Sequence, residues 1–326
     1  MEDNKETILQ VKNLHVHYVT DDEEVKAVNG ITFDLKKGES LGLVGETGAG
    51  KTTTAMAIMQ LIPDPPGIIT EGEIYFKGQN LIFNTDKENQ KIRGNGISMI
   101  FQDPMTALNP IMTIGDQLTE VVMKHQKMGK AEAQKRVKEM LEIVGVKSDR
   151  FNDYPHQFSG GMKQRVVITM ALICNPDLLI ADEPTTALDV TIQAQVLDIM
   201  MQLREKYKMA MILITHDLGV VAETCDRVAI VYAGEIVEIG TVEEVYLHPK
   251  HPYTKGLFDS IPKIDEDTEK LVPIDGMMPN MAELPTGCYF HPRCPYCKDI
   301  CKKESPQLLG KEHQCKCHFP LKEDRV

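Results

Sequence analysis

The stretch Gly45-Glu46-Thr47-Gly48-Ala49-Gly50-Lys51-Thr52 decides the fold, because it matches the pattern GxxxxGK(S/T). The apolar run Ser40–Val44 precedes it and predicts a strand, and the run Thr52–Leu61, rich in Ala and Met, predicts a helix. Glycines let backbone N–H groups close around phosphate oxygens, and the helix directs its positive end toward them. We expect Lys51 to reach the β- and γ-phosphates and the Thr52 hydroxyl to bind Mg²⁺. A chance glycine turn would not also have this strand, this helix and the Lys-Thr pair.

The rest of the chain places this loop in an α/β sheet. From about Thr113 to Gly145 the apolar residues recur at helical spacing, as Val137, Met140, Leu141 and Val144 show. Three later apolar runs predict buried parallel strands, namely Leu178–Ala181, Met211–Ile214 and Val228–Tyr232. Strands that alternate with helices are typical of a P-loop α/β core. After about Gly240 the regular pattern fades, which predicts a loop-rich appendage.

Polar residues follow two of the predicted strands. Asp182 and Glu183 come at the end of the run that starts at Leu178. There Asp182 can hold Mg²⁺ through water, and Glu183 can polarise the attacking water as a general base. Such a pair is by itself often a solvated turn, so the hypothesis depends on the glycine loop. His216 follows the run Met211–Ile214, and the residues alone leave open whether it is catalytic or a structural hydrogen-bonding group.

Composition narrows the function. The net charge of -12 argues against a nucleic-acid-binding surface, which is usually basic. The sequence contains no run of about twenty apolar residues, so it predicts no membrane-spanning helix. The first ten residues, MEDNKETILQ, are acidic and polar and lack a signal-peptide pattern. We therefore expect a chain in a reducing compartment, where clustered cysteines indicate metal binding more than disulfides.

The cysteines fall into two groups. Cys174 and Cys225 stand alone and are expected to be inert thiols. Six others crowd into one C-terminal stretch, namely Cys288, Cys294, Cys297, Cys301, Cys315 and Cys317. The spacings Cys294-x2-Cys297 and Cys315-x-Cys317, with His291, His313 and His318 nearby, suggest structural zinc. Four thiolates can equally hold an iron–sulfur cluster, so the spacing leaves the metal open.

The segment Tyr154–Arg165, YPHQFSGGMKQR, resembles the signature motif of ABC transporter ATPases. GETGAGKTT at 45–53, LLIADEP at 178–184, TALD at 186–189 and His216 complete the set of that family in its order. The resemblance covers about residues 9–240. The common signature Leu-Ser-Gly-Gly-Gln is here Phe158-Ser159-Gly160-Gly161-Met162. Ser159 and the two glycines keep the hydroxyl and amides that bind a γ-phosphate, so Met162 puts only one side-chain contact in doubt.

The resemblance implies a role for each matching residue. Gln102 is the Q-loop glutamine that touches Mg²⁺, Asp189 is the D-loop aspartate, and His216 is the switch histidine at the γ-phosphate. Tyr18 resembles the aromatic residue that stacks on adenine, although a strand tyrosine packed in the core remains an alternative. The ATP-binding residues implied are Tyr18, Gly45, Glu46, Thr47, Gly48, Ala49, Gly50, Lys51, Thr52, Thr53, Gln102 and Asp182. Mg²⁺ is assigned to Thr52, Gln102 and Asp182, and the signature Ser159, Gly160, Gly161 and Met162 acts in trans on a second cassette.

The tail resembles one branch of that family. HPKHPYTKGL at 248–257 resembles the HPYT segment of dipeptide and oligopeptide importer ATPases, and GCYFHPRC at 287–294 with Cys317-His318 resembles their cysteine domain. The resemblance implies a [4Fe-4S] cluster on Cys288, Cys294, Cys301 and Cys317, with zinc as the alternative, and leaves Cys297 and Cys315 outside the pattern. Because the nucleotide site falls in another segment, ATP binding by the monomer is expected to survive loss of the cluster.

The expected architecture is an ABC ATPase cassette over residues 1–240, with a helical subdomain at about 103–174, followed by a cysteine-rich domain over 241–326. The resemblance implies an ATP-sandwich dimer with a second related ATPase or with itself. It also implies two membrane permeases and an extracytoplasmic peptide-binding protein, which would place the chain at the cytoplasmic face of the membrane. Intact Lys51, Glu183 and His216 argue against a non-hydrolysing cassette. Tandem cassettes or long coiled coils, typical of ABC ATPases in translation or DNA repair, are not found. Uptake of nickel or another small solute, and export, remain open.

Overall fold

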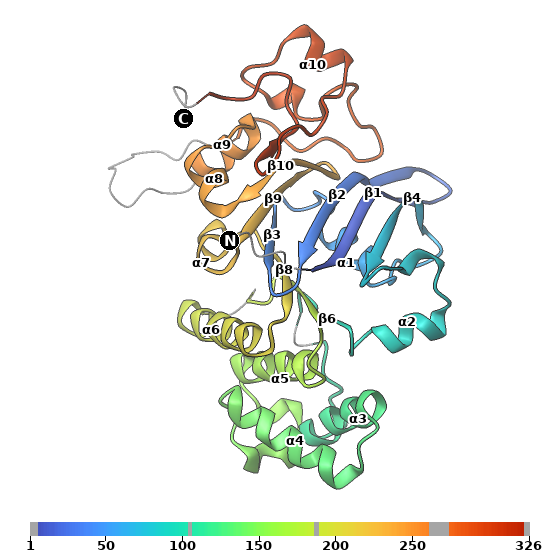
Figure 1. The fold of residues 1–326 in the computed structure, drawn as a ribbon, viewed down its shortest axis with the longest axis vertical. Coiled ribbons are helices and arrows are strands. Elements are labelled where there is room, and N and C mark those ends of the chain that lie inside the picture. Colours follow the sequence, from blue (N-terminus) through green and yellow to red (C-terminus); the bar gives the residue numbers. More distant parts are fainter. Residues whose placement is uncertain (1–5, 104–105, 186–188, 261–273, 323–326) are drawn as a thin grey trace. The chain divides into compact units, whose positions relative to one another are not determined.

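The computed structural model describes residues 6–103, 106–185, 189–260 and 274–322. These residues form two compact units. Figure 1 labels their helices and strands. The first unit contains the described parts of Met1–Leu9, Leu35–Ser40 and Phe76–Ile214. The second contains those of Gln10–Asp34, Leu41–Tyr75 and Thr215–Val326. Within the described ranges, no helix combines the length and the apolar character that crossing a membrane requires.

Parallel strands make the centre of the first unit. β7 (Leu178–Asp182) pairs in parallel with β6 (Ile97–Ile100) on one side and with β8 (Ala210–Ile214) on the other. Every residue of β7 and β8 is buried, as expected for strands covered on both faces. The prediction of buried parallel strands from these two apolar runs is therefore confirmed.

The first unit also contains helices, of which α5 packs against β6. Their bounds are α2 Asp86–Ile92, α3 Ile114–Gln126, α4 Lys130–Ile143, α5 Gly160–Leu172 and α6 Val190–Tyr207. The short elements are β5 Gln79–Asn80, η1 Leu81–Phe83, η2 Ser148–Asn152 and η3 Pro155–Gln157. α3, α4 and α5 pack against one another (Figure 1). The predicted helical stretch 113–145 is two helices, because Lys127 takes a left-handed conformation with φ 50° and ends α3.

The second unit contains two sheets. β1 (Thr7–Val19), most of which belongs to this unit, lies between β2 (Glu24–Lys36) and β4 (Gly67–Phe76). In the other sheet β3 (Ser40–Val44) pairs in parallel with β9 (Arg227–Tyr232), so the strands predicted at 40–44 and 228–232 are confirmed. β10 (Glu235–Thr241) then pairs antiparallel with both β9 and β11 (Gln314–Cys315). The chain thus returns, far along the sequence, to add the last strand.

Short helices complete the second unit. Their bounds are α1 Lys51–Ile58, α7 Leu218–Thr224, α8 Val242–Leu247, α9 Pro252–Asp259, η4 His291–Arg293 and α10 Asp299–Lys303. Regular structure therefore continues past Gly240 in α8 and α9, where the sequence pattern predicts loops. One buried apolar cluster joins the sheet to the C-terminal segment, by which we mean residues 274–322. The cluster contains Tyr232, Tyr253 and Phe290. Burial of such large side chains is a main source of stability in this unit.

Candidate functional site

The phosphate loop connects β3 to α1 in a tight turn. A Cβ atom on Gly45 would lie 2.1 Å from the Val231 carbonyl oxygen, and Gly50 has φ 97°. Only glycine fits these two positions without strain, which explains the glycines of the motif. The Lys51 ammonium is buried and donates to the carbonyl oxygens of Gly45 at 2.7 Å and Glu46 at 3.0 Å. The loop therefore has the compact form and the helix N-terminus that an anion site needs.

The other predicted residues of the loop differ in exposure. Thr47, Gly48 and Thr52 are exposed, Thr53 is half-buried, and Ala49 is buried. The Ala49 amide donates to the Glu46 carbonyl oxygen at 3.1 Å, which closes the turn. Thr52, the expected Mg²⁺ ligand, follows Lys51 in the first turn of α1. Thr52 is thus accessible at the surface of the loop.

Two carboxylates stand at the carboxyl end of β7 in the first unit. Asp182 is the last residue of the strand and is 2% exposed. Glu183 has φ 45°, a left-handed conformation that is rare outside glycine and is found at functional sites. Gln102 Nε2 donates to Glu183 Oε2 at 3.0 Å, so the structure brings these two predicted residues together. The contact holds the carboxylate of the expected general base in one orientation.

The signature residues lie at the start of α5, also in the first unit. The Ser159 hydroxyl oxygen caps the helix by accepting from the Met162 amide at 3.4 Å, and Gly160 and Gly161 open its first turn. Ser159, Gly161 and Met162 line a surface pocket of about 440 Å³. The pocket is also lined by Arg165, the last residue of the signature segment, and by Lys147, Asp149 and Arg150, which the sequence analysis did not single out. A helix N-terminus with nearby positive charge is suited to a phosphate group.

The remaining predicted residues of the nucleotide site are Asp189, His216 and Tyr18. Asp189 caps α6 by accepting from the Ile192 amide at 3.0 Å, while residues 186–188 of the TALD tetrad lie outside the described residues. His216 is exposed in the loop after β8. Tyr18 is half-buried in β1 beside Gly67, where a Cβ atom would meet the tyrosine ring at 2.9 Å. Tyr18 and His216 belong to the second unit with the phosphate loop, and Asp189 belongs to the first.

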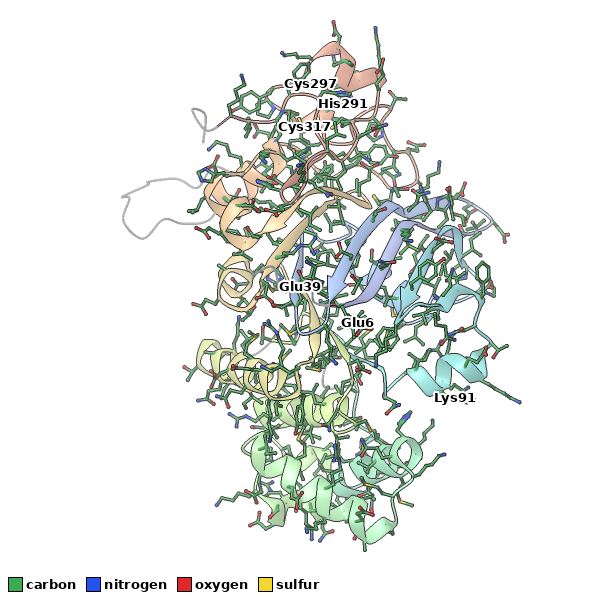
Figure 2. All side chains as sticks on the ribbon, in the orientation of Figure 1. Glu6, Glu39, Lys91, His291, Cys297 and Cys317 are labelled. Carbon is green, nitrogen blue, oxygen red and sulfur yellow. The ribbon has the colours of Figure 1, made fainter. Side chains whose placement is uncertain are left out.

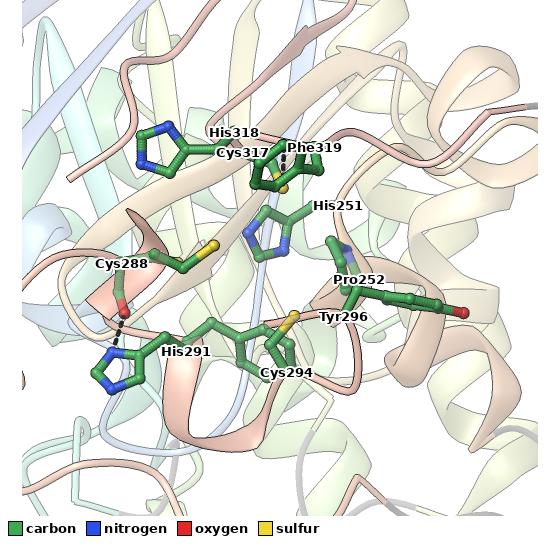
Figure 3. Close-up of a pocket in the computed structure, with 11 residues that line it drawn as sticks. His251, Pro252, Cys288, His291, Cys294, Tyr296, Cys317, His318 and Phe319 are labelled. Carbon is green, nitrogen blue, oxygen red and sulfur yellow. Dashed lines mark hydrogen bonds between the residues drawn. The ribbon is translucent and has the colours of Figure 1, made fainter. Parts of the chain in front are cut away.

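A cavity in the C-terminal segment is lined by the four thiols that the resemblance selects, Cys288, Cys294, Cys301 and Cys317. Figure 3 shows the sulfur atoms of Cys288, Cys294 and Cys317 directed toward the same space. The ring of His291 turns away, with Nδ1 3.0 Å from the Cys288 carbonyl oxygen. Burial raises the pKa of the Cys288 thiol to about 12 and that of Cys294 to about 11. Thiolates here would need a cation beside them.

The two remaining thiols of the stretch lie in other surroundings. Cys297, labelled in Figure 2, is half-buried, and its sulfur lies 3.7 Å from the Lys298 carbonyl oxygen. Cys315 belongs to β11 and is opposite Glu238 of β10. In the described part of the chain, no three His, Cys, Asp or Glu residues form a group that could hold a metal ion. The four thiols that the resemblance selects thus line one cavity, and Cys297 and Cys315 do not line it.

A buried carboxylate that the sequence analysis missed joins the C-terminal segment to the sheet. Glu238 is fully buried and accepts from the amides of Lys250 at 2.7 Å and His251 at 2.8 Å. Its Oε1 also lies 2.6 Å from His313 Nε2. Burial lowers the pKa of His251 to about 4, so this ring is neutral. The only sequence signal was a charged residue within the apolar run Ile236–Ile239.

Comparison with known proteins identifies the family. The family described as ABC transporter matches residues 28–186, and the one described as oligopeptide/dipeptide transporter, C-terminal region, matches residues 237–301. The dipeptide transport ATP-binding protein DppD of Bacillus subtilis (strain 168) is 53% identical over 316 residues, which cover 96% of this chain and 94% of that protein. This chain belongs to the ABC transporter ATP-binding proteins. It is the ATP-hydrolysing subunit of such a transporter.

Other ABC transporter ATP-binding proteins support this assignment. The oligopeptide transport protein OppD of Bacillus subtilis (strain 168) is 52% identical over 305 residues, which cover 93% of this chain and 85% of OppD. The dimeric ATP-binding cassette MJ0796, in a post-hydrolysis state bound to ADP and Pi, has a TM-score of 0.65 and 28% identity over 72% of this chain and 99% of its own. The expected ABC ATPase cassette fold is therefore confirmed.

Proposed function

We propose that this ATP-hydrolysing subunit powers the import of dipeptides or oligopeptides through partner membrane permeases. The observation that carries the proposal is the match of residues 237–301 to the C-terminal region of oligopeptide/dipeptide transporters. The relatives named for dipeptide and oligopeptide transport cover more than nine tenths of this chain. Nickel uptake, the alternative from the sequence, is not favoured by these relatives.

The residues of the nucleotide site have separate chemical roles in this proposal. The loop amides and Lys51 bind the β- and γ-phosphates, and Thr52 and Asp182 hold Mg²⁺, directly or through water. Glu183 acts as the general base toward the attacking water, and His216 contacts the γ-phosphate. The hydrogen bond from Gln102 to Glu183 supports a role for Gln102 in orienting that base, beside its expected contact with Mg²⁺.

Partners complete the proposed machine. Ser159 and its glycines act on the ATP of a second cassette, which is a related ATPase or a second copy of this chain, and the dimeric neighbour MJ0796 supports this arrangement. Two permeases and an extracytoplasmic peptide-binding protein supply the path and the cargo, and the chain works at the cytoplasmic face of the membrane. We assign the cassette to residues 1–240, its helical subdomain to about 103–174, and the C-terminal domain to 241–326.

The C-terminal domain is proposed to hold a [4Fe-4S] cluster on Cys288, Cys294, Cys301 and Cys317. Four sulfur donors around one cavity are the ligand set that such a cluster uses, and they fit it in number and kind. When bound, the cluster supplies cross-links between loops that bury little apolar surface. The chain's own contribution is to bring the thiols together, since Cys301 sits in α10 and Cys288 precedes η4. Zinc is the alternative outcome of the metal analysis.

The function is tested by uptake in cells that lack only this gene. We expect the deletion to abolish uptake of a radiolabelled dipeptide, and the wild-type gene to restore it. The Glu183→Gln gene, expressed at the same level, should not restore it. Uptake of labelled nickel serves as the control, and loss of nickel uptake with normal dipeptide uptake would contradict the proposal.

A further inference from the structure

The cysteine-rich stretch, residues 288–317, contacts the phosphate loop through the buried side chain of one arginine. Arg293 immediately precedes Cys294, and its Nη1 donates to Glu46 Oε1 at 2.9 Å and Oε2 at 3.1 Å. The side chain is 6% exposed. Its Nε also donates to the Asp275 carbonyl oxygen at 3.0 Å, so the guanidinium is fixed from both sides. A buried, charge-assisted contact of this kind restricts both partners strongly.

A second contact reaches the same loop residue from α9. The Tyr253 hydroxyl oxygen accepts from the Glu46 amide at 3.0 Å, and the tyrosine is fully buried. The two residues just before it, His251 and Pro252, line the cysteine cavity. The Tyr253 ring also lies 5.4 Å from that of Phe290, another residue of the cavity wall. One short helix therefore faces the cavity at its start and the phosphate loop one residue later.

Glu46 is the point where these contacts meet. Its amide is held by Tyr253, its carboxylate by Arg293 and its carbonyl oxygen by Lys51. A methionine of the C-terminal segment, Met278, adds an apolar contact, since its Cε would lie 3.1 Å from a Cβ on Gly48. The amides of such a loop bind phosphate only when they point inward together, so the groups that fix its shape affect affinity.

We propose that Tyr253 and Arg293 are positioning residues of the phosphate loop, through which nucleotide affinity depends on the state of the cysteine cavity. Neither side chain needs to touch the nucleotide. Both act by holding Glu46, and each is next in sequence to a residue that lines the cavity, Pro252 for Tyr253 and Cys294 for Arg293. The sequence predicts that the nucleotide site is independent of the cysteine cluster, whereas these contacts connect the phosphate loop to residues beside the cysteine cavity. Loss of a bound metal should therefore weaken nucleotide binding. This last step rests on the proposed metal site, whereas the positioning role does not.

The first test compares matched variants by titration with a fluorescent ADP analogue. Tyr253→Phe keeps the ring but leaves the Glu46 amide unpaired, and we expect about three- to tenfold weaker binding. The control is Tyr246→Phe, which removes a hydroxyl bonded to the Leu218 carbonyl oxygen at 2.6 Å, away from the loop. Tyr246→Phe should bind like the wild type. Equal affinity of Tyr253→Phe and Tyr246→Phe, in folded proteins with similar melting curves, would overturn the positioning role.

A second comparison examines the arginine. Arg293→Met should weaken binding about tenfold and raise the KM for ATP more than it lowers kcat. The control Arg227→Met removes an arginine whose Nη1 donates to the Asp34 carbonyl oxygen at 3.2 Å. If Arg293 acts through Glu46, the double variant Glu46→Gln with Arg293→Met should bind no more weakly than Arg293→Met alone. If the double variant instead loses affinity by the product of the two single-variant losses, Arg293 does not act through Glu46.

The dependence on the cavity is measured on protein purified without oxygen. Removing the metal with an iron chelator should weaken binding of the ADP analogue several-fold in the wild type and add little in Arg293→Met. Unchanged wild-type affinity after metal loss would overturn the coupling. Protein that never contains metal would instead refute the proposed cluster, and the comparison of Tyr253→Phe with Tyr246→Phe would still decide the positioning role.

Discussion

Replacing the buried carboxylate Glu238 by alanine should detach the C-terminal segment from the sheet. In the wild type this carboxylate accepts from two backbone amides, of Lys250 and His251, and pairs with the His313 ring. The residue is fully buried, so water does not replace the lost acceptor without a local opening. Two of the three donors come from the residues just before α9 and the third from the loop before β11, and these are the parts that hold the segment in place.

The structure sets the size of the effect. Each buried donor left without a partner costs about 1–3 kcal/mol, so three donors amount to about 3–6 kcal/mol after partial relaxation. A typical domain is stable by only about 5–15 kcal/mol. Glu238→Ala should therefore raise the population of a form in which the C-terminal segment is open by at least about a hundredfold. The matched control is Glu243→Ala, because Glu243 is exposed on α8 and its loss should change stability by less than about 0.5 kcal/mol.

Hydrogen exchange followed by mass spectrometry measures this opening. Peptides that contain the amides of Lys250 and His251 should exchange much faster in Glu238→Ala, while peptides from β7 and β8 should keep their protection. Glu243→Ala should exchange like the wild type throughout. Wild-type protection at Lys250 and His251 in the Glu238→Ala variant would refute the reasoning, because it would show that the carboxylate does not hold these amides.

The remaining predictions concern the nucleotide and metal sites. Glu183→Gln should bind ATP normally but lose turnover by about 10²-fold or more, and wild-type hydrolysis would remove it as the base. Lys51→Ala should abolish nucleotide binding by the monomer, since it removes the ammonium of the cradle, whereas Ser159→Ala should impair only dimer formation with ATP. Titration of each monomer with a fluorescent nucleotide separates the two, because only Ser159→Ala should still bind it. Cys301→Ser should remove the iron of protein purified without oxygen, while Cys297→Ser should keep about four irons per chain. Colourless wild-type protein with one zinc would contradict that last expectation.

Local signals were enough to predict the centre of each unit. A strand, a glycine loop and a helix in succession specify the phosphate loop. The left-handed backbone conformation at Gly50 is one that glycine adopts readily, so the residue type itself predicts it. Uninterrupted apolar runs such as Leu178–Ala181 likewise specify buried parallel strands. Helix ends were harder to predict. The end of α3 depends on a left-handed conformation at Lys127, and a lysine does not predict that conformation.

Contacts between distant residues could not be predicted from this single sequence. Arg293 and Glu46 are 247 positions apart, and although each lies in a recognisable motif, nothing in the sequence pairs one with the other. Glu238 stands in an apolar run where a charged residue is costly, and only the structure shows the donors that offset its burial. The choice of four thiols among six came from resemblance rather than from spacing, because spacing alone fits zinc equally well.

The most direct test of the central claim is coupled transport in vesicles that contain this chain, its partner ATPase and the two permeases. With the peptide-binding protein and a labelled dipeptide on one side and ATP on the other, we expect the dipeptide to accumulate on the ATP side. ATP consumption should rise when the dipeptide is present. Vesicles assembled with the Glu183→Gln chain should show neither effect. ATP hydrolysis that neither responds to dipeptide nor moves it across the membrane would contradict the account.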